Sequence, residues 1–422
     1  MKKTRELLCF LYYFPPMPGS APKRNFRIIS GLAPCFERIQ IITSHKITDT
    51  NNLPKDCEVT STKPLDYRSL LTSVSSVGFI EEKNKKNSVA RFVVKVLNSF
   101  PFNILFGEGG SAYWLRNYFK GVRLIHETGI THLYSSFRPI TDHFTAYMLK
   151  LRFPHLFWIA DFRDLIIDPH YQQQIFPKID HFIYKKIFRR ANIITTVSEG
   201  FAINLKKYNS NSISVMNGVD DFSNFPATVK NEYFKIVYTG SMFLNERNAE
   251  PLFAAIRELI ANGRINSNLV QIIYAGKDAY EWQAWAEKYE LTSLLKLKGM
   301  LSGYDAIQLQ NDSNINVLLT IASSELQGIL TGKLVEYLTA GNPILAIIKG
   351  SSDIYLNEIF SKLDAGLVAT DDYSSIQSIS KFILKYYNEW KISGSNSKII
   401  NESILQEEFS MKYLLKPLID QL

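Results

Sequence analysis

The stretch GILTGKLVEYLTAGNPILA, residues 328–346, predicts a turn, a helix and a buried strand in direct succession. Gly328 and Gly332 favour a turn, and apolar side chains then recur at helical spacing until Gly341 and a proline end the helix. The apolar run 344–348 predicts the strand. A helix that opens on small residues presents unpaired backbone N–H groups and the positive end of its dipole, so its first turn is suited to binding an anion.

Two charged side chains make this stretch more specific. Lys333 lies in the predicted first turn, where a cation is unfavourable for the helix unless an anion binds beside it. Glu336 follows one turn later, and its carboxylate can accept hydrogen bonds from sugar hydroxyls. Phosphate donors next to such a carboxylate indicate a site for a nucleotide-diphosphate sugar. A core helix with a solvated lysine and glutamate fits the same pattern and stays open as the alternative.

Size and charge limit the classes of function. The chain has 422 residues, 46% of them hydrophobic and 21% charged, which is enough for two domains of an ordinary soluble protein. The net charge of +8 is uneven, because residues 1–205 hold 28 basic and 16 acidic side chains and the remainder holds 20 and 24. A basic first half indicates an anionic partner: a membrane surface, a phosphorylated substrate or a nucleic acid. The aromatic-interleaved motifs of RNA-binding proteins are missing, which disfavours the nucleic acid.

The cysteines and the hydropathy favour a cytosolic protein. Cys9, Cys35 and Cys57 are few and unpaired in spacing, which argues against a disulfide framework or a zinc site. The apolar residues near the N-terminus end at Pro15, which favours a first buried strand over a signal peptide. No apolar run approaches the length that a membrane span requires.

Strand-like and helix-like segments alternate through both halves of the chain. This alternation predicts an α/β protein with two doubly wound parallel-sheet domains facing across a cleft. The charge balance and a polar stretch place the domain boundary near residue 220. We therefore expect one domain over 1–220, a second over 221–400, and a C-terminal helix over 401–422 that could cross back to the first domain.

Charged side chains follow two of the predicted strands in the first half, where a parallel sheet binds its ligands. Asp161, Arg163 and Asp164 come directly after the apolar run 156–160, so we interpret them as candidate catalytic groups. An ion pair that merely ties this loop is the alternative. Beyond the loop that follows the first strand, two arginines could meet an anion: Arg24 and Arg27.

Two segments combine an apolar stripe with flanking cations. Residues 81–106 have the composition of a helix lying on a membrane surface, although a helix packed on the core with a solvated basic face fits equally well. Residues 179–190 are likewise amphipathic and basic.

Six blocks occur in a recognisable order: YYFPPMPGS (12–20), WIADFRD (158–164), TVSE (196–199), NGVD (217–220), YTG (238–240) and GKLVEYLTAGNP (332–343). This collinear set resembles the GT-B glycosyltransferases, in particular the retaining family 4 enzymes of bacterial surface-polysaccharide assembly with FPP-x-GG, DFRD and SKLFEY-type motifs. The resemblance spans nearly the whole chain. It implies that the first domain binds the acceptor and the second binds the nucleotide-sugar donor.

Carried over residue by residue, the resemblance implies roles for single side chains. Glu336 matches the second glutamate of a paired motif and would contact the ribose. The first glutamate falls at Gly328, so Glu325 is the candidate replacement. Arg247 matches a lysine that binds the donor diphosphate, and Ser241 stands where many members have an arginine. The implied donor-binding set is Gly240, Ser241, Arg247, Gly276, Gly299, Thr331, Gly332, Lys333, Leu334 and Glu336. The implied acceptor-binding set is Gly19, Ser20, Arg24 and Arg27.

The expected reaction follows from this assignment. Arg247, Lys333 and the helix N-terminus would stabilise the charge that develops on the leaving diphosphate. With no evident nucleophile, front-face attack would retain the configuration, with Asp161 or Asp164 as a general base in the alternative case. We expect no cofactor and no metal. The expected partners are a nucleotide sugar, a saccharide or lipid-linked saccharide acceptor and an anionic membrane, which would place the protein on the inner face of the cytoplasmic membrane.

Two other functions fit the same architecture. A sugar-nucleotide 2-epimerase would carry its own acid–base groups and need no acceptor. A non-catalytic family member acting as a partner subunit would explain Gly328 and Ser241. The donor sugar, the base, the acceptor and the linkage depend on pocket geometry, which the sequence pattern does not give.

Overall fold

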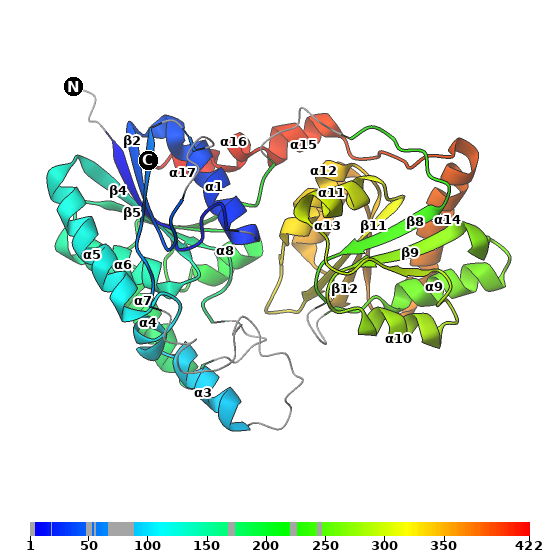
Figure 1. Cartoon of the computed structure of the whole chain (residues 1–422), viewed down its shortest axis with the longest axis horizontal. Coiled ribbons are helices and arrows are strands. Elements are labelled where there is room, and N and C mark those ends of the chain that lie inside the picture. Colours follow the sequence, from blue (N-terminus) through cyan, green and yellow to red (C-terminus); the bar gives the residue numbers. More distant parts are fainter. Residues whose placement is uncertain are drawn as a thin grey trace. The chain divides into compact units, whose positions relative to one another are not determined.

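The computed structural model describes residues 5–17, 19–47, 53–54, 56–65, 88–167, 174–219, 226–242 and 247–422. Residues 81–87 of the predicted basic helix, Pro18 of the first motif block and Asp220 of the NGVD block lie outside the described residues. The chain divides into two compact units (Figure 1). Unit 1 is Met1–Asn217 together with Met411–Leu422, and unit 2 is Gly218–Ser410.

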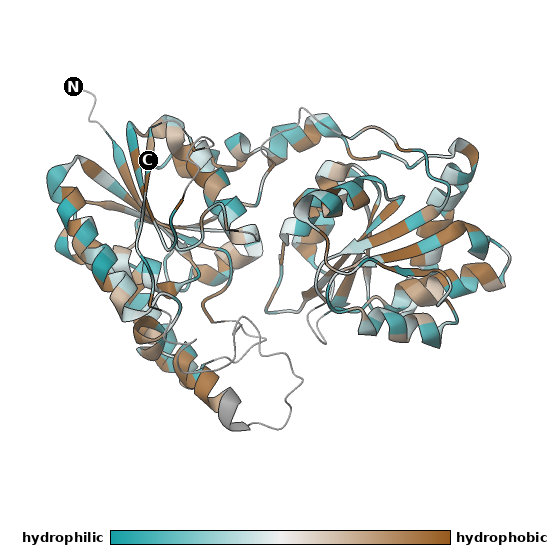
Figure 2. Cartoon of the chain, viewed as in Figure 1, coloured by the Kyte–Doolittle hydropathy of each residue, from teal (hydrophilic) through white to brown (hydrophobic). Residues whose placement is uncertain are grey.

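Unit 1 is built on a parallel sheet, which has seven strands in its described part. Their order, β3-β2-β1-β4-β5-β6-β7, reverses direction between β1 and β4, as in a doubly wound fold. The central strands are buried along nearly their whole length, including polar residues of β4, because both faces of the sheet are covered (Figure 2). The strands are β1 (Glu6–Phe10), β2 (Arg38–Thr43), β3 (Cys57–Ser61), β4 (Ile130–Phe137), β5 (Phe157–Phe162), β6 (Ile193–Thr196) and β7 (Ser212–Ser214).

The helices of unit 1 begin where the sequence supplies caps or a proline. Ser198 caps α8 by accepting a hydrogen bond from the N–H of Phe201, and Pro177 opens α7. The predicted helix over 81–106 is wrong in extent, because its described part is broken by residues 99–101, which contain Pro101. The helices are α1 (Ser20–Leu32), η1 (Ala33–Cys35), α3 (Ser88–Asn98), α4 (Phe102–Leu105), α5 (Gly110–Glu127), α6 (Ile140–Arg152), α7 (Pro177–Phe188), α8 (Glu199–Leu205), α16 (Met411–Leu414) and α17 (Lys416–Ile419).

Unit 2 repeats the same topology. Its sheet is parallel, in the order β10-β9-β8-β11-β12-β13, and the switch point lies between β8 and β11. The fold-class prediction of two doubly wound parallel sheets is therefore confirmed for the architecture of each unit. The strands are β8 (Phe234–Thr239), β9 (Val270–Ala275), β10 (Leu295–Leu297), β11 (Ile315–Ala322), β12 (Ile344–Gly350) and β13 (Gly366–Thr370).

The stretch 328–346 forms the helix and strand that its pattern predicts. Helix α12 (Gly332–Ala340) ends at Gly341, whose φ of 77° is the left-handed conformation typical of a helix end, and β12 follows. The other helices of unit 2 are α9 (Glu250–Ala261), η3 (Ser267–Leu269), α10 (Tyr280–Lys288), α11 (Gly303–Asn311), α13 (Ile354–Leu363), η4 (Tyr373–Ser375), α14 (Ile376–Ser393) and α15 (Glu402–Phe409). Within the part of the chain that the structure describes, no helix combines the length and the apolar character needed to span a bilayer.

The end of the chain packs in unit 1. In place of one C-terminal helix over 401–422, α15 belongs to unit 2 and the short helices α16 and α17 belong to unit 1. Leu415 is fully buried in the core that also holds Ile28 and Leu32 of α1. It lies so close to Gly31 that a Cβ atom there would overlap the leucine side chain.

We expect Leu415→Ala to destabilise unit 1 by about 2–5 kcal/mol, because the substitution leaves a cavity beneath α1. Urea unfolding followed by hydrogen exchange of unit 1 amides measures the effect. Leu151→Ala is the matched control, since Leu151 of α6 is 41% exposed in the same unit. Equal effects of the two substitutions would show that the C-terminal segment does not support the unit 1 core.

Candidate functional site

The loops after β8 and β9 lie against each other at the carboxyl edge of the unit 2 sheet. The N–H of Gly240, directly after β8, donates to the carbonyl of Ala275 at 2.7 Å. Gly276 lies so close to the Gly240 carbonyl and the Tyr274 hydroxyl that a Cβ atom at position 276 would overlap both. The two glycines therefore let these loops approach each other beside the switch point between β8 and β11, where doubly wound folds bind ligands.

Lys333 extends from the first turn of α12 onto Gly240. A Cβ atom at position 240 would overlap the end of the lysine side chain, and the φ of 119° at Gly240 is itself unfavourable for other residues. The ammonium lies 5.6 Å from the centre of the Tyr238 ring. Burial and the nearby Arg247 outweigh the attraction of Glu336 and lower the pKa of Lys333 to about 8.

Arg247 is held beside the same loop. Its guanidinium donates to the Tyr238 hydroxyl at 2.8 Å and to the carbonyl of Ser241. The Tyr238 ring stacks on Tyr274, with ring centres 5.9 Å apart, which fixes the hydroxyl that Arg247 contacts. Ser241 thus takes part through its backbone, and two cations share one region at the end of β8.

The start of α12 completes this region. Thr331 holds the N-cap position, yet its hydroxyl makes no capping bond and its Oγ1 is buried without a partner among the described residues. The first turn contains no acidic side chain, and among its N–H groups only that of Leu334 has an acceptor in the described residues, the Thr331 carbonyl at 3.1 Å. A helix start with these features can accept an anion.

Glu336 lies one turn along α12 and is connected to β8. The side-chain amide of Gln310 donates to Glu336 Oε2 at 3.2 Å and to Thr239 Oγ1 at 2.9 Å. The hydroxyl of Tyr337 contacts the same threonine at 3.2 Å. These hydrogen bonds hold the Glu336 carboxylate in place, close enough to Lys333 to affect the pKa of the lysine. Gln310 was missed in the sequence because no motif marks a glutamine on the preceding helix.

Three further positions of unit 2 that were considered from the sequence make none of the contacts described above. Gly299 is exposed, and a Cβ atom there would meet nothing within 4 Å. It follows β10, and the residue before it donates its N–H to the carbonyl of Tyr274 at 2.9 Å. Glu325 is exposed in the loop before α12. Gly328, where the resemblance implies a glutamate, donates its N–H to the carboxylate of Asp353 at 2.8 Å, which ties this loop to the start of α13.

In unit 1, the predicted acceptor residue Arg24 and the predicted catalytic residue Asp161 form a buried ion pair at 2.7 Å. Arg24 also donates to the carbonyl of Val215, and Asp161 also accepts from Thr195 and Ser136. Burial alone would raise the pKa of Asp161, but Arg24 and Thr195 reverse this effect and lower it. These two predictions are corrected: the pair ties α1 to β5, and neither group is open to a ligand.

The remaining unit 1 candidates stay near the surface. The Arg163 guanidinium donates to the Phe137 carbonyl at 2.9 Å and lies 5.9 Å from the Tyr13 ring centre. Asp164 is exposed, and so are Gly19 and Ser20 at the start of α1. Arg27, on the same helix, is half-buried.

The described residues contain no group of three or more His, Cys, Asp and Glu side chains arranged to hold a metal ion. The positive charges beside the loop after β8 are those of the Arg247 and Lys333 side chains, the two cations predicted from the sequence.

Neither a known protein-family model nor a curated protein sequence matches this chain. Solved structures do match. Sucrose-phosphate synthase (tll1590) from Thermosynechococcus elongatus is 13% identical with a TM-score of 0.56, covering 99% of this chain and 100% of that one. WaaG, a glycosyltransferase involved in lipopolysaccharide biosynthesis, is 13% identical with a TM-score of 0.54, covering 98% and 99%. An E. coli protein described as trehalose-6-phosphate bound with UDP-2-fluoro glucose is 8% identical with a TM-score of 0.62, covering 99% and 98%. At these identities the likeness shows that the chain has the fold of the GT-B glycosyltransferases.

Lys333 gives the site a distinctive pH dependence. We expect the affinity for inorganic pyrophosphate to fall as the pH rises above about 8, because the free protein loses the ammonium proton there. Lys333→Met should bind more weakly at neutral pH and lack this additional fall. Isothermal titration of wild type and Lys333→Met across the pH range measures the affinity at neutral pH and its fall at higher pH. Ionisation of pyrophosphate affects both proteins equally, so the difference between them reports on Lys333.

The lowered pKa of Lys333 also determines whether the stability of the folded chain rises or falls with pH. Because the pKa of Lys333 is lowered from 10.5 to about 8, the folded chain binds fewer protons than the unfolded chain between these values. Without ligand, wild type should therefore gain stability relative to Lys333→Met as the pH rises through that window. Parallel pH profiles of the two proteins would contradict the assigned environment of Lys333.

Proposed function

We propose that the chain is a glycosyltransferase of the hexosyltransferase type. It moves a sugar, with retention, from a nucleotide-diphosphate sugar to a saccharide or lipid-linked saccharide, as in the family 4 enzymes of capsule, O-antigen or exopolysaccharide assembly. Unit 2 binds the donor and unit 1 binds the acceptor. The observation that carries the proposal is the meeting of Lys333, Arg247 and the uncapped start of α12, with Glu336 one turn away.

The donor site is arranged for a pyrophosphate. Holding Lys333 charged at neutral pH costs about 3 kcal/mol, from a pKa lowered from 10.5 to about 8. A bound dianion would offset this cost and would also give the Thr331 hydroxyl and the helix N–H groups an acceptor. Glu336 lies where it would accept hydrogen bonds from the ribose hydroxyls. UDP is the nucleotide in the names of two similar solved structures, which supports this ligand class.

The chemistry follows from charge development. As the glycosidic bond breaks, the diphosphate gains negative charge, and Arg247, Lys333 and the helix N-terminus stabilise it. In front-face transfer the acceptor proton passes to the leaving phosphate oxygen, so no carboxylate base is required. Asp161 does not serve as that base because it is committed to Arg24, which leaves Asp164 as the carboxylate alternative. Since two side-chain cations neutralise the diphosphate, we propose that transfer needs no added metal.

A surface of unit 1 supports attachment to a membrane. Near Ser99, α3 and α7 meet, because the Ser99 hydroxyl accepts from the N–H of Ile175 and the N–H of Phe100 donates to Asp180. The large apolar side chains exposed there are Phe92, Val93, Phe102, Leu105, Phe176, Ile179 and Phe182. The exposed cations of α7 and its end are Lys178, Lys185, Lys186, Arg189 and Arg190. We call this set the α3–α7 surface, and its apolar and basic character suits the anionic inner leaflet.

Nucleotide-sugar binding tests the donor site. We expect one member of a panel of nucleotide sugars to raise the melting temperature of the chain, and we expect Glu336→Ala and Arg247→Ala each to abolish the rise. Glu287→Ala and Arg264→Ala are matched controls on exposed residues of unit 2. A full shift with either site variant would refute its assigned role.

The products then separate the three functions considered from the sequence. Transfer to an added saccharide in the presence of EDTA supports the proposal. Conversion of the nucleotide sugar without an acceptor identifies the epimerase, and binding without hydrolysis or transfer identifies the non-catalytic subunit.

Vesicle co-sedimentation tests the α3–α7 surface. Replacing Lys185 and Lys186 by alanine should weaken binding to phosphatidylglycerol vesicles by about 2 kcal/mol, roughly thirtyfold, at low salt. Phe182→Ser should weaken it further, because Phe182 is 59% exposed. The controls are the exposed Lys381 and Lys391 of unit 2, replaced together by alanine, and Ile392→Ser. Equal binding by site and control variants, or equal binding to phosphatidylcholine vesicles, would exclude this surface.

A further inference from the structure

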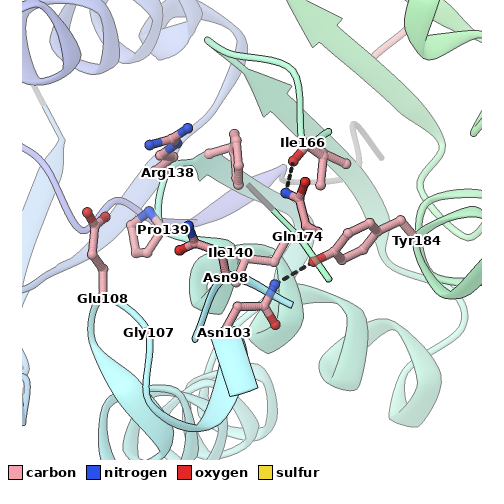
Figure 3. Close-up of a pocket in the computed structure, with 11 residues that line it drawn as sticks. Asn98, Asn103, Gly107, Glu108, Arg138, Pro139, Ile140, Ile166, Gln174 and Tyr184 are labelled. Atoms are coloured by element: carbon pink, nitrogen blue, oxygen red, sulfur yellow. Dashed lines mark hydrogen bonds between the residues drawn. The ribbon is translucent and has the colours of Figure 1, made fainter. Parts of the chain in front are cut away.

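Unit 1 contains an open pocket that none of the sequence motifs predicts (Figure 3). It has an empty volume of about 520 Å³, including its mouth. Its walls come from the end of α3, from α4, from the loop before α5, from the connection between β4 and α6, and from α7 with the residue Gln174 before it. It therefore lies at the carboxyl end of β4, where a parallel sheet of this kind binds ligands.

Three hydrogen-bond acceptors in this pocket have no donor in the part of the chain that the structure describes. Asn103 Oδ1, Glu108 Oε2 and Gln174 Oε1 are buried and have no partner among the described residues. The other end of each amide is already committed, since Gln174 donates to the Ile166 carbonyl at 3.2 Å and Asn103 donates to the Tyr184 hydroxyl. Asn103 is only 9% exposed, so its orphan oxygen is not simply solvated. A buried polar group without a partner costs about 1–3 kcal/mol, which a bound ligand with donor groups would remove.

A cation lies at the rim of the same pocket. The Arg138 guanidinium is half-buried and lies 5.7 Å from the Phe137 ring centre. In Figure 3, Arg138 and Glu108 lie on one side of the pocket, and Asn98, Asn103 and Gln174 lie between them and Tyr184. The pocket thus offers acceptors inside and a donor at its mouth.

This combination selects one class of ligand. A phosphate or carboxylate entering the pocket would meet Glu108 and two carbonyl oxygens, all of which repel it. An ammonium would meet Arg138 at the entrance. An apolar group would leave the three acceptors unsatisfied. A ring with several hydroxyls satisfies both kinds of group, because each hydroxyl donates and accepts.

The pocket is connected to the loops that the proposed reaction uses. Burial and then the negative charge of the nearby Glu108 carboxylate raise the pKa of the Tyr13 hydroxyl, which places Tyr13 close to Glu108. Arg163 donates to the carbonyl of Phe137, the residue before Arg138. We propose that this pocket binds a pyranose ring of the saccharide acceptor, with Glu108, Gln174 and Asn103 accepting from its hydroxyls and Arg138 donating to its oxygens. This inference rests on the proposed glycosyltransferase function and moves the acceptor site away from Arg24.

Saturation-transfer NMR with the full chain tests the pocket. The probes are the methyl glycosides of glucose, galactose and mannose, with methyl phosphate as the anionic comparison. We expect transfer to the ring protons of at least one glycoside in wild type. In Lys333→Ala, where the cationic site of unit 2 is weakened, we expect no transfer to methyl phosphate. Glu108→Gln and Gln174→Leu should each weaken that glycoside about tenfold, because each removes one acceptor for a buried hydroxyl. Glu127→Gln, on exposed α5 surface of the same unit, should leave its affinity unchanged.

The measurement is repeated in Lys333→Ala, so that glycoside binding at the donor site does not contribute. If the glycoside still binds Lys333→Ala and no longer binds Glu108→Gln, the pocket inference is supported. This holds even if no nucleotide sugar binds unit 2. Failure of nucleotide-sugar binding would refute only the proposed function. Absence of transfer to every glycoside in wild type overturns the inference. So does an unchanged affinity in both pocket variants, provided that their melting temperatures show them folded.

Discussion

The close approach of Lys333 to Gly240 is the contact on which the proposed donor site depends. The lysine comes from the loop and helix after β11, and the glycine ends β8. Because the sheet order places β8 next to β11 with their crossovers leaving in opposite directions, these two loops meet at the edge of the sheet. A side chain at position 240 would displace the ammonium from the Tyr238 ring and from Arg247. The absence of a side chain at Gly240 thus allows Lys333 to lie in the same region as Arg247.

Local patterns were enough to predict the framework of this site. The helical period of residues 333–340 and the glycine that ends it depend only on neighbours in sequence, and α12 and β12 form as predicted. Lys333 and Glu336 could be assigned to one helix face for the same reason. Gln310, which orients Glu336, could not be predicted, because its contact depends on how α11 packs against α12.

Long-range pairing explains the predictions that failed. Arg24 and Asp161 were both correctly expected at ligand-binding ends of the sheet, but they are separated by 137 residues and neutralise each other there. Position relative to a strand end says where a charge lies and does not say what it contacts. The pocket of unit 1 is the converse case. Its acceptors, from Asn103, Glu108 and Gln174, belong to no motif, and only the packing of α4 and α7 around β4 brings them together.

The candidate site of unit 2 is rich in positive charge, whereas the pocket of unit 1 is rich in hydrogen-bond acceptors. Unit 2 belongs to the half of the chain with more acidic than basic side chains, yet its described site combines Lys333, Arg247 and a helix N-terminus. Unit 1 belongs to the basic half, yet three acceptor oxygens in its pocket have no donor among the described residues. Net charge therefore describes the surfaces, such as the basic α3–α7 surface, and does not identify what a buried site binds. A diphosphate would supply the negative charge that the cations of unit 2 attract. A saccharide would supply the hydroxyl donors that the acceptor oxygens of unit 1 need. Each unit is therefore complementary to a different one of the two proposed substrates.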